Sequence, residues 1–386
     1  MDAALLDLER ELIAFDTVSH RSNLALIDFV EARLRALGLE TARFASPDGA
    51  KANLFATLGP ADAGGLMLAG HTDVVPVEGQ DWSSDPFTLR EAGGRLYGRG
   101  TADMKSFIAQ ALHTVAAFRD RRLRVPLHLA FTYDEEVGCD GAERLVAGLQ
   151  AAGGPLPRCA VIGEPTGFQV FRMHKGLCAV KVTVRGVEGH SGKPTHGVNA
   201  IYPAARVVQR LTELEAELKG RRSLEADFEL PYTTLNVGLL RAGTALNIIP
   251  NRAELVFEYR TMPGEEPDYV LRQVTGFVDE VLRPELKAAD PRADVEVRTL
   301  TRRAPLLLPP GSPIEALALE LTGAARATAA PYFTEGGIYT EGGIPTVICG
   351  PGDIDQAHRP DEFITVEQME RGLPLLAGLI ERVCLA

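Results

Sequence analysis

The 386-residue sequence predicts an α/β protein, in which helices cover both faces of a mixed sheet and a smaller domain is inserted. Short apolar runs that alternate with amphipathic stretches predict the sheet and its helices. Near residue 178 the order of elements changes to βαββαβ, the ferredoxin-like arrangement, and near residue 300 the first pattern returns. The chain therefore divides into a first part at 1–177, an inserted domain at 178–300 and a second part at 301–386.

The first part begins with two amphipathic helices. The first is predicted by the spacing of Leu5, Leu8 and Leu12, and the second is expected between Asn23, a residue type that caps helices, and Gly38. Strands and helices then alternate. The expected strands are 52–58, 66–69, 125–133 and 160–163, and the expected helices are 104–118 and 142–152.

The inserted domain is expected to form strands and helices at 179–187, 198–219, 233–240, 253–261, 267–282 and 294–300. A sheet of this kind leaves an edge strand, expected at 233–240 or 179–187, and an open edge invites pairing with a second copy. We therefore expect a homodimer formed through this domain. The second part is expected to contain a helix at 313–325, a strand at 345–349 and a final helix at 366–383.

Charge and composition exclude several classes of partner. The 40 Lys and Arg residues against 52 Asp and Glu residues give a net charge of −12, which disfavours nucleic acid and anionic membrane surfaces. No apolar run approaches the roughly 20 residues of a membrane span, and the acidic N-terminal segment does not resemble a signal peptide. A cytoplasmic protein with reduced, scattered cysteines is expected.

Five imidazole or acidic residues follow apolar runs or stand at the start of a helix: His71, Asp103, Glu136, Glu164 and His358. Side chains at the carboxyl ends of strands can converge although they are far apart in sequence. Two imidazoles and three carboxylates suit zinc or a similar divalent ion. Five ligands exceed the needs of one tetrahedral ion with an open position, so they predict two ions that share a carboxylate, as in a hydrolase.

Two further acidic residues are expected to assist this centre. Glu135 stands beside Glu136 and could take a proton from the attacking water and pass it to the leaving amine. Asp73, two residues after His71, is positioned to accept the second ring N–H of that histidine.

The ordered motifs resemble the superfamily of dizinc aminoacylases, acetylornithine deacetylases, succinyl-diaminopimelate desuccinylases and carboxypeptidases. They are GHTDVVP at 70–76, LYGRGTADMK at 96–105, DEEVG at 134–138, GEPT at 163–166, GHS at 189–191 and AH at 357–358. The resemblance implies a dizinc-peptidase catalytic domain, with the inserted domain as a lid and dimerisation domain.

The resemblance also assigns roles to the residues. It implies that His71 and Glu164 hold one zinc, that Glu136 and His358 hold the other, and that Asp103 bridges them. Cobalt or manganese is left open for either position.

Further roles follow from the same resemblance. Glu135 would be the general base and acid, and the peptide bond after Asp103 would be cis. His190 would polarise the scissile carbonyl, often from the other subunit, and is preferred to His196 in this role.

Local features are most similar to acetylornithine deacetylases: DEEVGC at 134–139, HKG at 174–176, TEGG at 334–337 and GPGDIDQAH at 350–358. They imply the removal of acetate from N2-acetyl-L-ornithine in arginine biosynthesis. Alternatives left open are a succinyl-diaminopimelate desuccinylase, a hydrolase of another N-acyl amino acid such as acetylcitrulline, and a dipeptidase. A member that binds an amino-acid derivative without catalysis is a different class.

Three residues are candidate substrate contacts. Arg260 ends an apolar run and carries a planar fork suited to a carboxylate. Asn247 precedes Ile248 and is either a substrate contact or a turn residue. Glu335 is the third, although a second TEGG at 340–343 leaves the register of this loop open.

Overall fold

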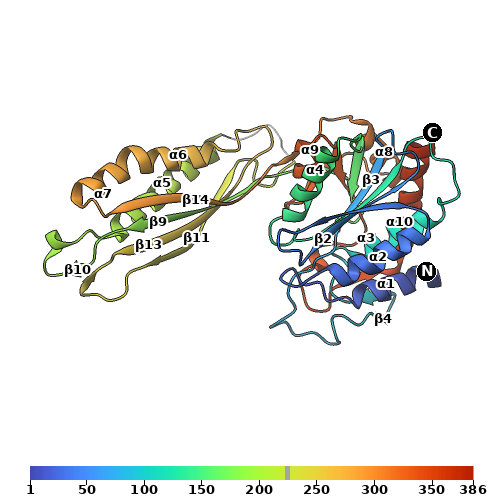
Figure 1. The fold of residues 1–386 in the computed structure, drawn as a ribbon, viewed down its shortest axis with the longest axis horizontal. Helices are drawn as coiled ribbons and strands as arrows, with labels where there is room; N and C mark the ends of the chain where they lie inside the picture. Colours follow the sequence, from blue (N-terminus) through green and yellow to red (C-terminus); the bar gives the residue numbers. More distant parts are fainter. Residues whose placement is uncertain (222–226, 386) are drawn as a thin grey trace. The chain divides into compact units, whose positions relative to one another are not determined.

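The computed structural model describes residues 1–221 and 227–385, and over these ranges the chain forms two compact units (Figure 1). The first unit comprises Met1–Met173, Leu306–Ala330 and Thr334–Ala386. The second comprises His174–Pro305 and Pro331–Phe333.

Among the described residues, the first unit is built on a nine-stranded sheet. Its strands are β1 (Glu40–Ala45), β2 (Ala52–Leu58), β3 (Leu66–His71), β6 (Leu127–Thr132), β7 (Cys159–Ile162), β8 (Phe171–His174), β15 (Leu306–Leu307), β16 (Thr328–Ala329) and β17 (Thr346–Ile348). Their order is β1-β2-β6-β3-β7-β17-β8-β15, and β16 pairs with β8. The central pairs β6/β3, β3/β7 and β7/β17 are parallel, whereas β1/β2 and β2/β6 are antiparallel. The predicted mixed α/β sheet is confirmed.

The central strands are buried on both faces. Every residue of β3 and β6 is buried, as expected for parallel strands that are covered by helices on each side. The helices are α1 (Ala3–Ile13), α2 (Leu24–Ala36), α3 (Lys105–Ala116), α4 (Asp140–Ala152), α8 (Pro313–Thr322), α9 (Gly336–Glu341) and α10 (Val366–Ile380). Figure 1 shows α4 and α9 on one side of the sheet and α1, α3 and α10 on the other. Over residues 1–221 and 227–385, no helix is long and apolar enough to cross a membrane.

The start of α2 differs in detail from the prediction. Asn23 occupies the N-cap position but makes no side-chain capping bond. Its amide nitrogen donates to the carbonyl of Ala52 and to Thr72 Oγ1, both at 2.9 Å, and its oxygen accepts the N–H of Ala52. The residue therefore joins the helix to β2 and to the residue that follows His71.

A small three-stranded sheet joins two segments that are far apart in sequence. It has the order β18-β5-β4 and consists of β4 (Arg90–Ala92), β5 (Arg95–Tyr97) and β18 (Phe363–Thr365). Tyr97 pairs with Phe363. The segment that leads to Asp103 is thereby fixed beside the segment that follows His358.

The second unit contains a four-stranded antiparallel sheet over the residues that the structure describes. Its elements are β9 (Leu177–Arg185), α5 (Ile201–Gly220), β11 (Thr234–Ala242), β13 (Arg252–Arg260), α6 (Tyr269–Phe277), a π-helical turn (Val278–Leu282), α7 (Arg283–Ala289) and β14 (Asp294–Arg303). The order is β11-β13-β9-β14. Because β9 lies between β13 and β14, the expectation that 179–187 forms an edge strand is wrong, and β11 and β14 are the edges.

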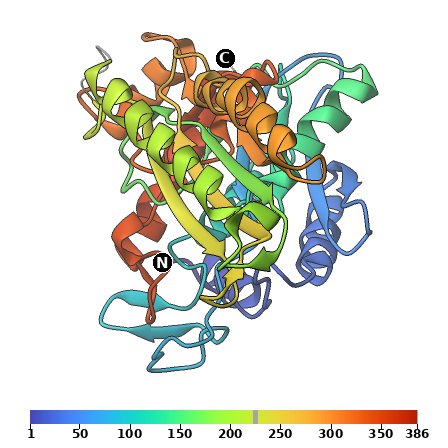
Figure 2. The same cartoon turned by 90° about the vertical axis from the view of Figure 1, so that its left-hand side faces the viewer.

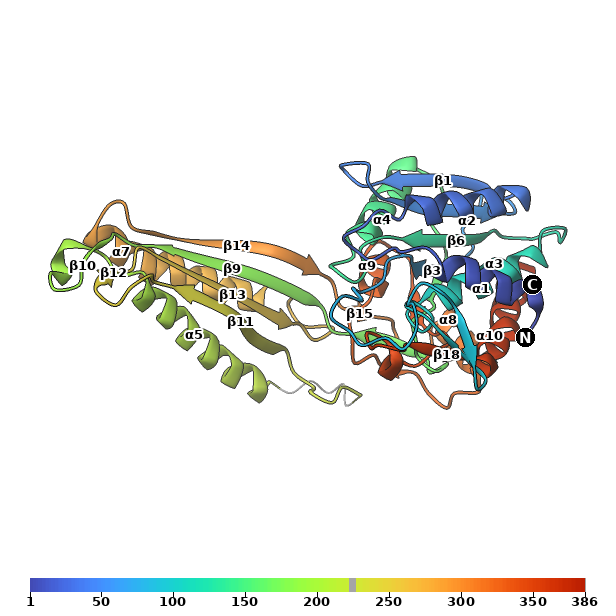
Figure 3. The same cartoon turned by 90° about the horizontal axis from the view of Figure 1, so that it is seen from below.

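One face of this sheet carries the helices, as Figures 2 and 3 show. Burial alternates along β13, so that every second side chain enters the core with α5 and α6. The unit extends slightly beyond residues 178 and 300 because β9 begins at Leu177 and β14 runs to Arg303.

Gly163 allows β7 to approach α3 closely. An ideal Cβ at this position would lie 2.0 Å from two ring atoms of Phe107. We expect Gly163→Ala to force the strand and helix apart and to lower the free energy of unfolding by about 1–3 kcal/mol. Urea denaturation of the metal-free protein measures this loss. Gly154→Ala is the matched control, because a Cβ there meets no atom within 4 Å; equal stability of the two variants would contradict the prediction.

Candidate active site

The candidate residues gather where three parallel strands end. His71 is the last residue of β3, Glu135 and Glu136 follow β6, and Glu164 follows β7. Because β6, β3 and β7 are adjacent and parallel, their carboxyl ends meet at one edge of the sheet. The Asp103 loop before α3 and the His358 loop after β17 complete the cluster.

Asp103 lies between the two histidines. Its Oδ1 is 2.9 Å from His71 Nε2, and its Oδ2 is 3.4 Å from His358 Nε2. Glu136 Oε2 lies 3.1 Å from His358 Nε2, and Glu164 Oε1 lies 3.8 Å from His71 Nε2. All five predicted ligands are thus brought together in two groups that share one carboxylate. The peptide bond between Asp103 and Met104 is cis, as the resemblance implies.

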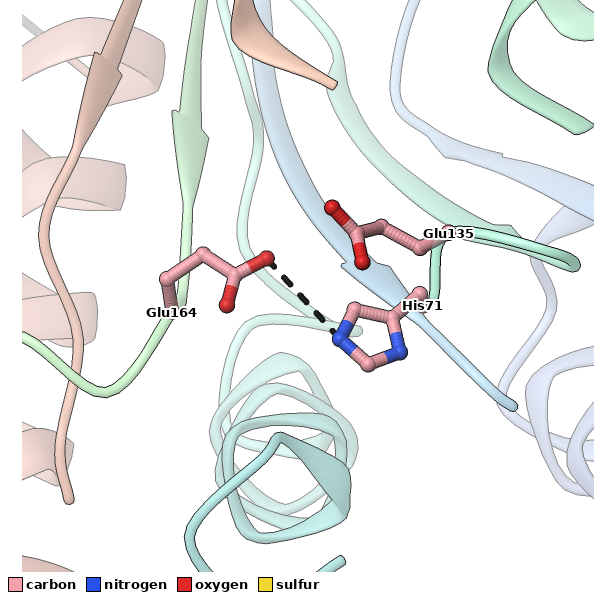
Figure 4. A group of neighbouring side chains, drawn as sticks. All are labelled: His71, Glu135 and Glu164. Carbon is pink, nitrogen blue, oxygen red and sulfur yellow. Dashed lines mark ion pairs between the residues drawn. The ribbon is translucent and has the colours of Figure 1, made fainter. Parts of the chain in front are cut away.

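Figure 4 shows His71, Glu135 and Glu164 directed toward one small space. Each of these residues offers a ligand atom within 4.8 Å of the others, and the same holds for His71, Asp103 and Glu136. The carboxylate of the predicted general base therefore lies beside the predicted ligands.

The buried carboxylates repel one another. Burial, followed by the charge of Asp103, raises the pKa of Glu164 well above its ordinary value and that of Glu136 to about 7. Burial also opposes ionisation of Asp103, but hydrogen bonds with His358 and His71 hold its pKa below the usual range. Hydrogen bonds to Asp103 and Glu136 raise the pKa of His358 to about 10. An added divalent cation would relieve this repulsion.

Glu164 provides a direct test of whether a metal ion fits. Its Oε1 is buried and has no hydrogen-bond partner among the described residues. A buried polar atom without a partner is costly, and a cation would satisfy this oxygen. The residues present therefore fit one or more divalent ions.

Asp73 acts differently from the prediction. His71 Nδ1 contacts the backbone carbonyl of Asp73 at 2.9 Å, whereas the carboxylate is 3.7 Å away. The carboxylate instead accepts the backbone N–H groups of Glu135 and Glu136, at 3.1 and 3.3 Å, and the hydroxyl of Ser19 at 2.7 Å. The expected ring contact is thus made by the backbone, and the side chain fixes the loop that presents both glutamates.

The structure shows which of the two TEGG runs places its glutamate near the site. Glu335 is buried, at 1% exposed, and accepts the hydroxyl of Tyr339 at 2.8 Å, whereas Glu341 is exposed. Burial raises the pKa of Glu335 to about 7, and its charge contributes to raising the pKa of Glu135. Glu335 is thus the member of the pair close to the site, and its contact with substrate stays a prediction.

The other three candidates belong to the second unit. His190 lies in β10 (Gly189–His190), which pairs with β12 (Ile248–Ile249), and Ser191 donates its N–H to the Asn247 carbonyl at 3.1 Å. His190 and Asn247 are therefore neighbours, and both are exposed.

The contacts of His190 and Arg260 differ. The Gly192 N–H donates to His190 Nδ1 at 3.0 Å, which leaves Nε2 as the proton-bearing nitrogen of the neutral ring. The strand β12, which pairs with His190, comes just before the first residue of β13, whereas Arg260 is the last residue of β13. The Arg260 guanidinium pairs with Glu258 at 3.4 Å. The structure does not bring Arg260 together with His190.

Sequence reasoning missed three polar residues. Arg99 donates to Glu362 and to Gln80. Glu362 accepts the backbone N–H of Asp103, and Gln80 donates to the backbone carbonyl of His358. Arg99 falls inside the motif at 96–105, so its position was a usable signal. The other two carried no motif or spacing that would distinguish them from surface residues.

A mixed sheet whose parallel strands end in paired imidazoles and buried carboxylates is the arrangement of a metal-dependent hydrolase. The chain belongs to peptidase family M20/M25/M40, with a match that covers residues 67–382. The resemblance drawn from the motifs is therefore confirmed.

Relatives of nearly the same length are similar throughout. The acetylornithine deacetylase of Myxococcus xanthus is 39% identical over 385 residues, which cover 97% of this chain and 96% of the relative. The acetylornithine deacetylase of Proteus mirabilis is 37% identical over 388 residues, which cover 99% and 97%.

Solved structures show the same fold at low identity. The M20 family metallo-carboxypeptidase Sso-CP2 from Sulfolobus solfataricus has a TM-score of 0.76 at 18% identity, covering 99% of both chains. The YXEP protein of Bacillus subtilis, described as a dinuclear metal binding peptidase, has a TM-score of 0.66 at 16% identity, covering 97% of this chain and 96% of that one.

Proposed function

We propose that the protein removes the acetyl group from N2-acetyl-L-ornithine and yields ornithine and acetate, a step of arginine biosynthesis. The observation that carries the hydrolytic part is the position of Asp103, whose two oxygens face two different histidines. The substrate part is supported by the relatives named acetylornithine deacetylase and by the motifs around His174, Glu335 and Gly350.

Two divalent ions, most simply zinc, complete this site. His71 and Glu164 would hold one ion, Glu136 and His358 the other, and Asp103 both; cobalt or manganese could replace zinc. Such ions supply Lewis acidity and make water nucleophilic at neutral pH. The buried Oε1 of Glu164, which has no hydrogen-bond partner among the described residues, supports this assignment.

The protein's own groups handle the proton and the substrate. Glu135, whose pKa is raised well above normal by burial and by the charges of Glu136 and Asp103, takes a proton from the attacking water and gives it to the leaving amine. His190 donates from Nε2 to the scissile carbonyl oxygen. Arg260 and Glu335 contact the amino-acid part of the substrate in their own chain, whereas Asn247, beside His190, contacts it from the partner subunit.

The proposal includes a cytoplasmic homodimer formed through the second unit. In its support, β11 is an edge strand that exposes Leu239 and Leu240, at 51% and 53%. An open strand edge with apolar side chains favours pairing with a second copy.

The expected effect of Glu135→Gln separates proton transfer from metal binding. An amide cannot shuttle a proton, so kcat should fall by about 10²–10⁴-fold while the metal content is unchanged. Steady-state kinetics and elemental analysis measure the two quantities. Glu341→Gln, at the exposed second TEGG, is the matched control. A variant that keeps normal kcat would assign the base to another residue.

Substrate choice is tested with a panel of N-acetyl and N-succinyl amino acids assayed for released amine. We expect kcat/KM for N2-acetylornithine to exceed that for N-succinyl-diaminopimelate by at least about tenfold, or about 1.4 kcal/mol of transition-state binding. The opposite order would favour the desuccinylase, and a preference for acetylcitrulline or a dipeptide would favour those activities. No turnover of any compound, despite binding, would favour the non-catalytic class.

Subunit exchange tests whether His190 acts on the partner's site. Glu135→Ala and His190→Ala are each expected to be inactive. If His190 acts across the dimer, a mixed dimer contains one intact site, and random mixing should restore about a quarter of wild-type activity.

The control pairs Glu135→Ala with Glu164→Ala. Both changes lie in the first unit, so mixing should restore nothing. Confirmed exchange without recovery in the first mixture would show that His190 acts within its own chain.

A further inference from the structure

A buried arginine connects the loops that carry Asp103 and His358. Arg99 is 1% exposed and is among the largest fully buried side chains. Its guanidinium donates to Glu362 Oε2 at 2.5 Å and to Gln80 Oε1 at 2.6 Å. It also stacks on Trp82, with 5.0 Å from Cζ to the ring centroid. A planar fork with two fixed acceptors sets the distance between the groups that it joins.

Glu362 holds the backbone of the Asp103 loop. Its Oε1 accepts the N–H groups of Gly100, Ala102 and Asp103 at 3.0, 2.8 and 3.1 Å. Its other oxygen is paired with Arg99. The carboxylate thus determines the path of the chain directly up to the shared ligand.

Gln80 holds the backbone of the His358 loop. Its amide nitrogen donates to the His358 carbonyl at 3.1 Å, while its oxygen accepts from Arg99. His358 needs this support, because its side chain is 52% exposed and its φ of 63° is a left-handed conformation that few side chains adopt. The adjacent Arg359 carbonyl accepts a weaker bond from Arg99 at 3.4 Å.

We propose that Arg99, Glu362 and Gln80 are positioning residues that fix the spacing between Asp103 and His358 and so set the affinity for the second metal ion. The inference rests on the proposed two-metal function. The ion between Glu136 and His358 depends on this network more than the other ion does, because the network holds the loop of His358 as well as that of the shared Asp103. The other two ligands of the first ion lie outside this network, because His71 is the last residue of β3 and Glu164 directly follows β7.

The test is a zinc titration of metal-free protein against a competing chromophoric chelator, with wild type, Arg99→Lys and Gln80→Ala. Lysine keeps the charge opposite Glu362 but lacks the fork that also reaches Gln80. Loss of a group that orients a metal ligand typically costs about 10–100-fold in affinity, and we expect this loss for one ion only, with the other within about threefold.

Two matched controls separate positioning from general damage. Gln150→Ala removes an amide that donates to the Gly342 carbonyl at 3.2 Å, and Arg172→Lys changes a buried arginine that donates to the Leu308 carbonyl at 3.2 Å. Both should bind two ions as the wild type does. The Tm of each metal-free variant reports on folding. If Arg99→Lys does not fold, the zinc titration of Gln80→Ala, a change at a partly exposed position, decides between positioning and general damage.

The outcomes are distinct. Selective loss of one ion in Arg99→Lys or Gln80→Ala, with normal controls, supports the inference. Unchanged binding of both ions, or equal weakening of both, in a folded variant overturns it. A wild-type protein that binds fewer than two ions overturns the proposed function, and the inference with it.

Discussion

The constraint on which the rest of this structure depends is the burial of several carboxylates within a few ångströms of one another. Asp103, Glu135, Glu136 and Glu164 meet at one edge of the sheet, where burial and mutual repulsion raise the pKa of three of them. Such a cluster is stable only with positive charge beside it and with backbone that cannot move away. The two histidines supply part of the charge, and the surrounding loops supply the rigidity.

That rigidity comes from acidic side chains that bind backbone rather than metal or substrate. Asp73 holds the N–H groups of Glu135 and Glu136, and Glu362 holds those that lead to Asp103. Each uses its negative charge to fix a loop that carries another negative charge. The predicted ligands are therefore backed by two further carboxylates whose oxygens accept backbone N–H groups of the ligand loops.

The sequence predicted the parts of this molecule that depend on burial. The runs at 52–58 and 66–69 are apolar because β2 and β3 lie inside the sheet, and the ligands were found because they follow such runs. β1 could not be found in this way, since its exposed residues leave no apolar pattern, and β8 and β16 form only through distant partners. The role of the Asp73 carboxylate depends on the fold of the 134–138 loop, and the interior position of β9 depends on pairing with β13 and β14, neither of which spacing reveals.

The pairing of β17 with β7 has a consequence for how the protein is made. β7 ends at Ile162, but its neighbour β17 begins only at Thr346, after the whole second unit has been synthesised. A nascent chain thus presents the open edge of β7 throughout the synthesis of residues 163–345, which include the whole second unit. His358 and Glu362 emerge later still, so the site is completed only in the final stage of synthesis, and until then the open edge of β7 can pair with another chain.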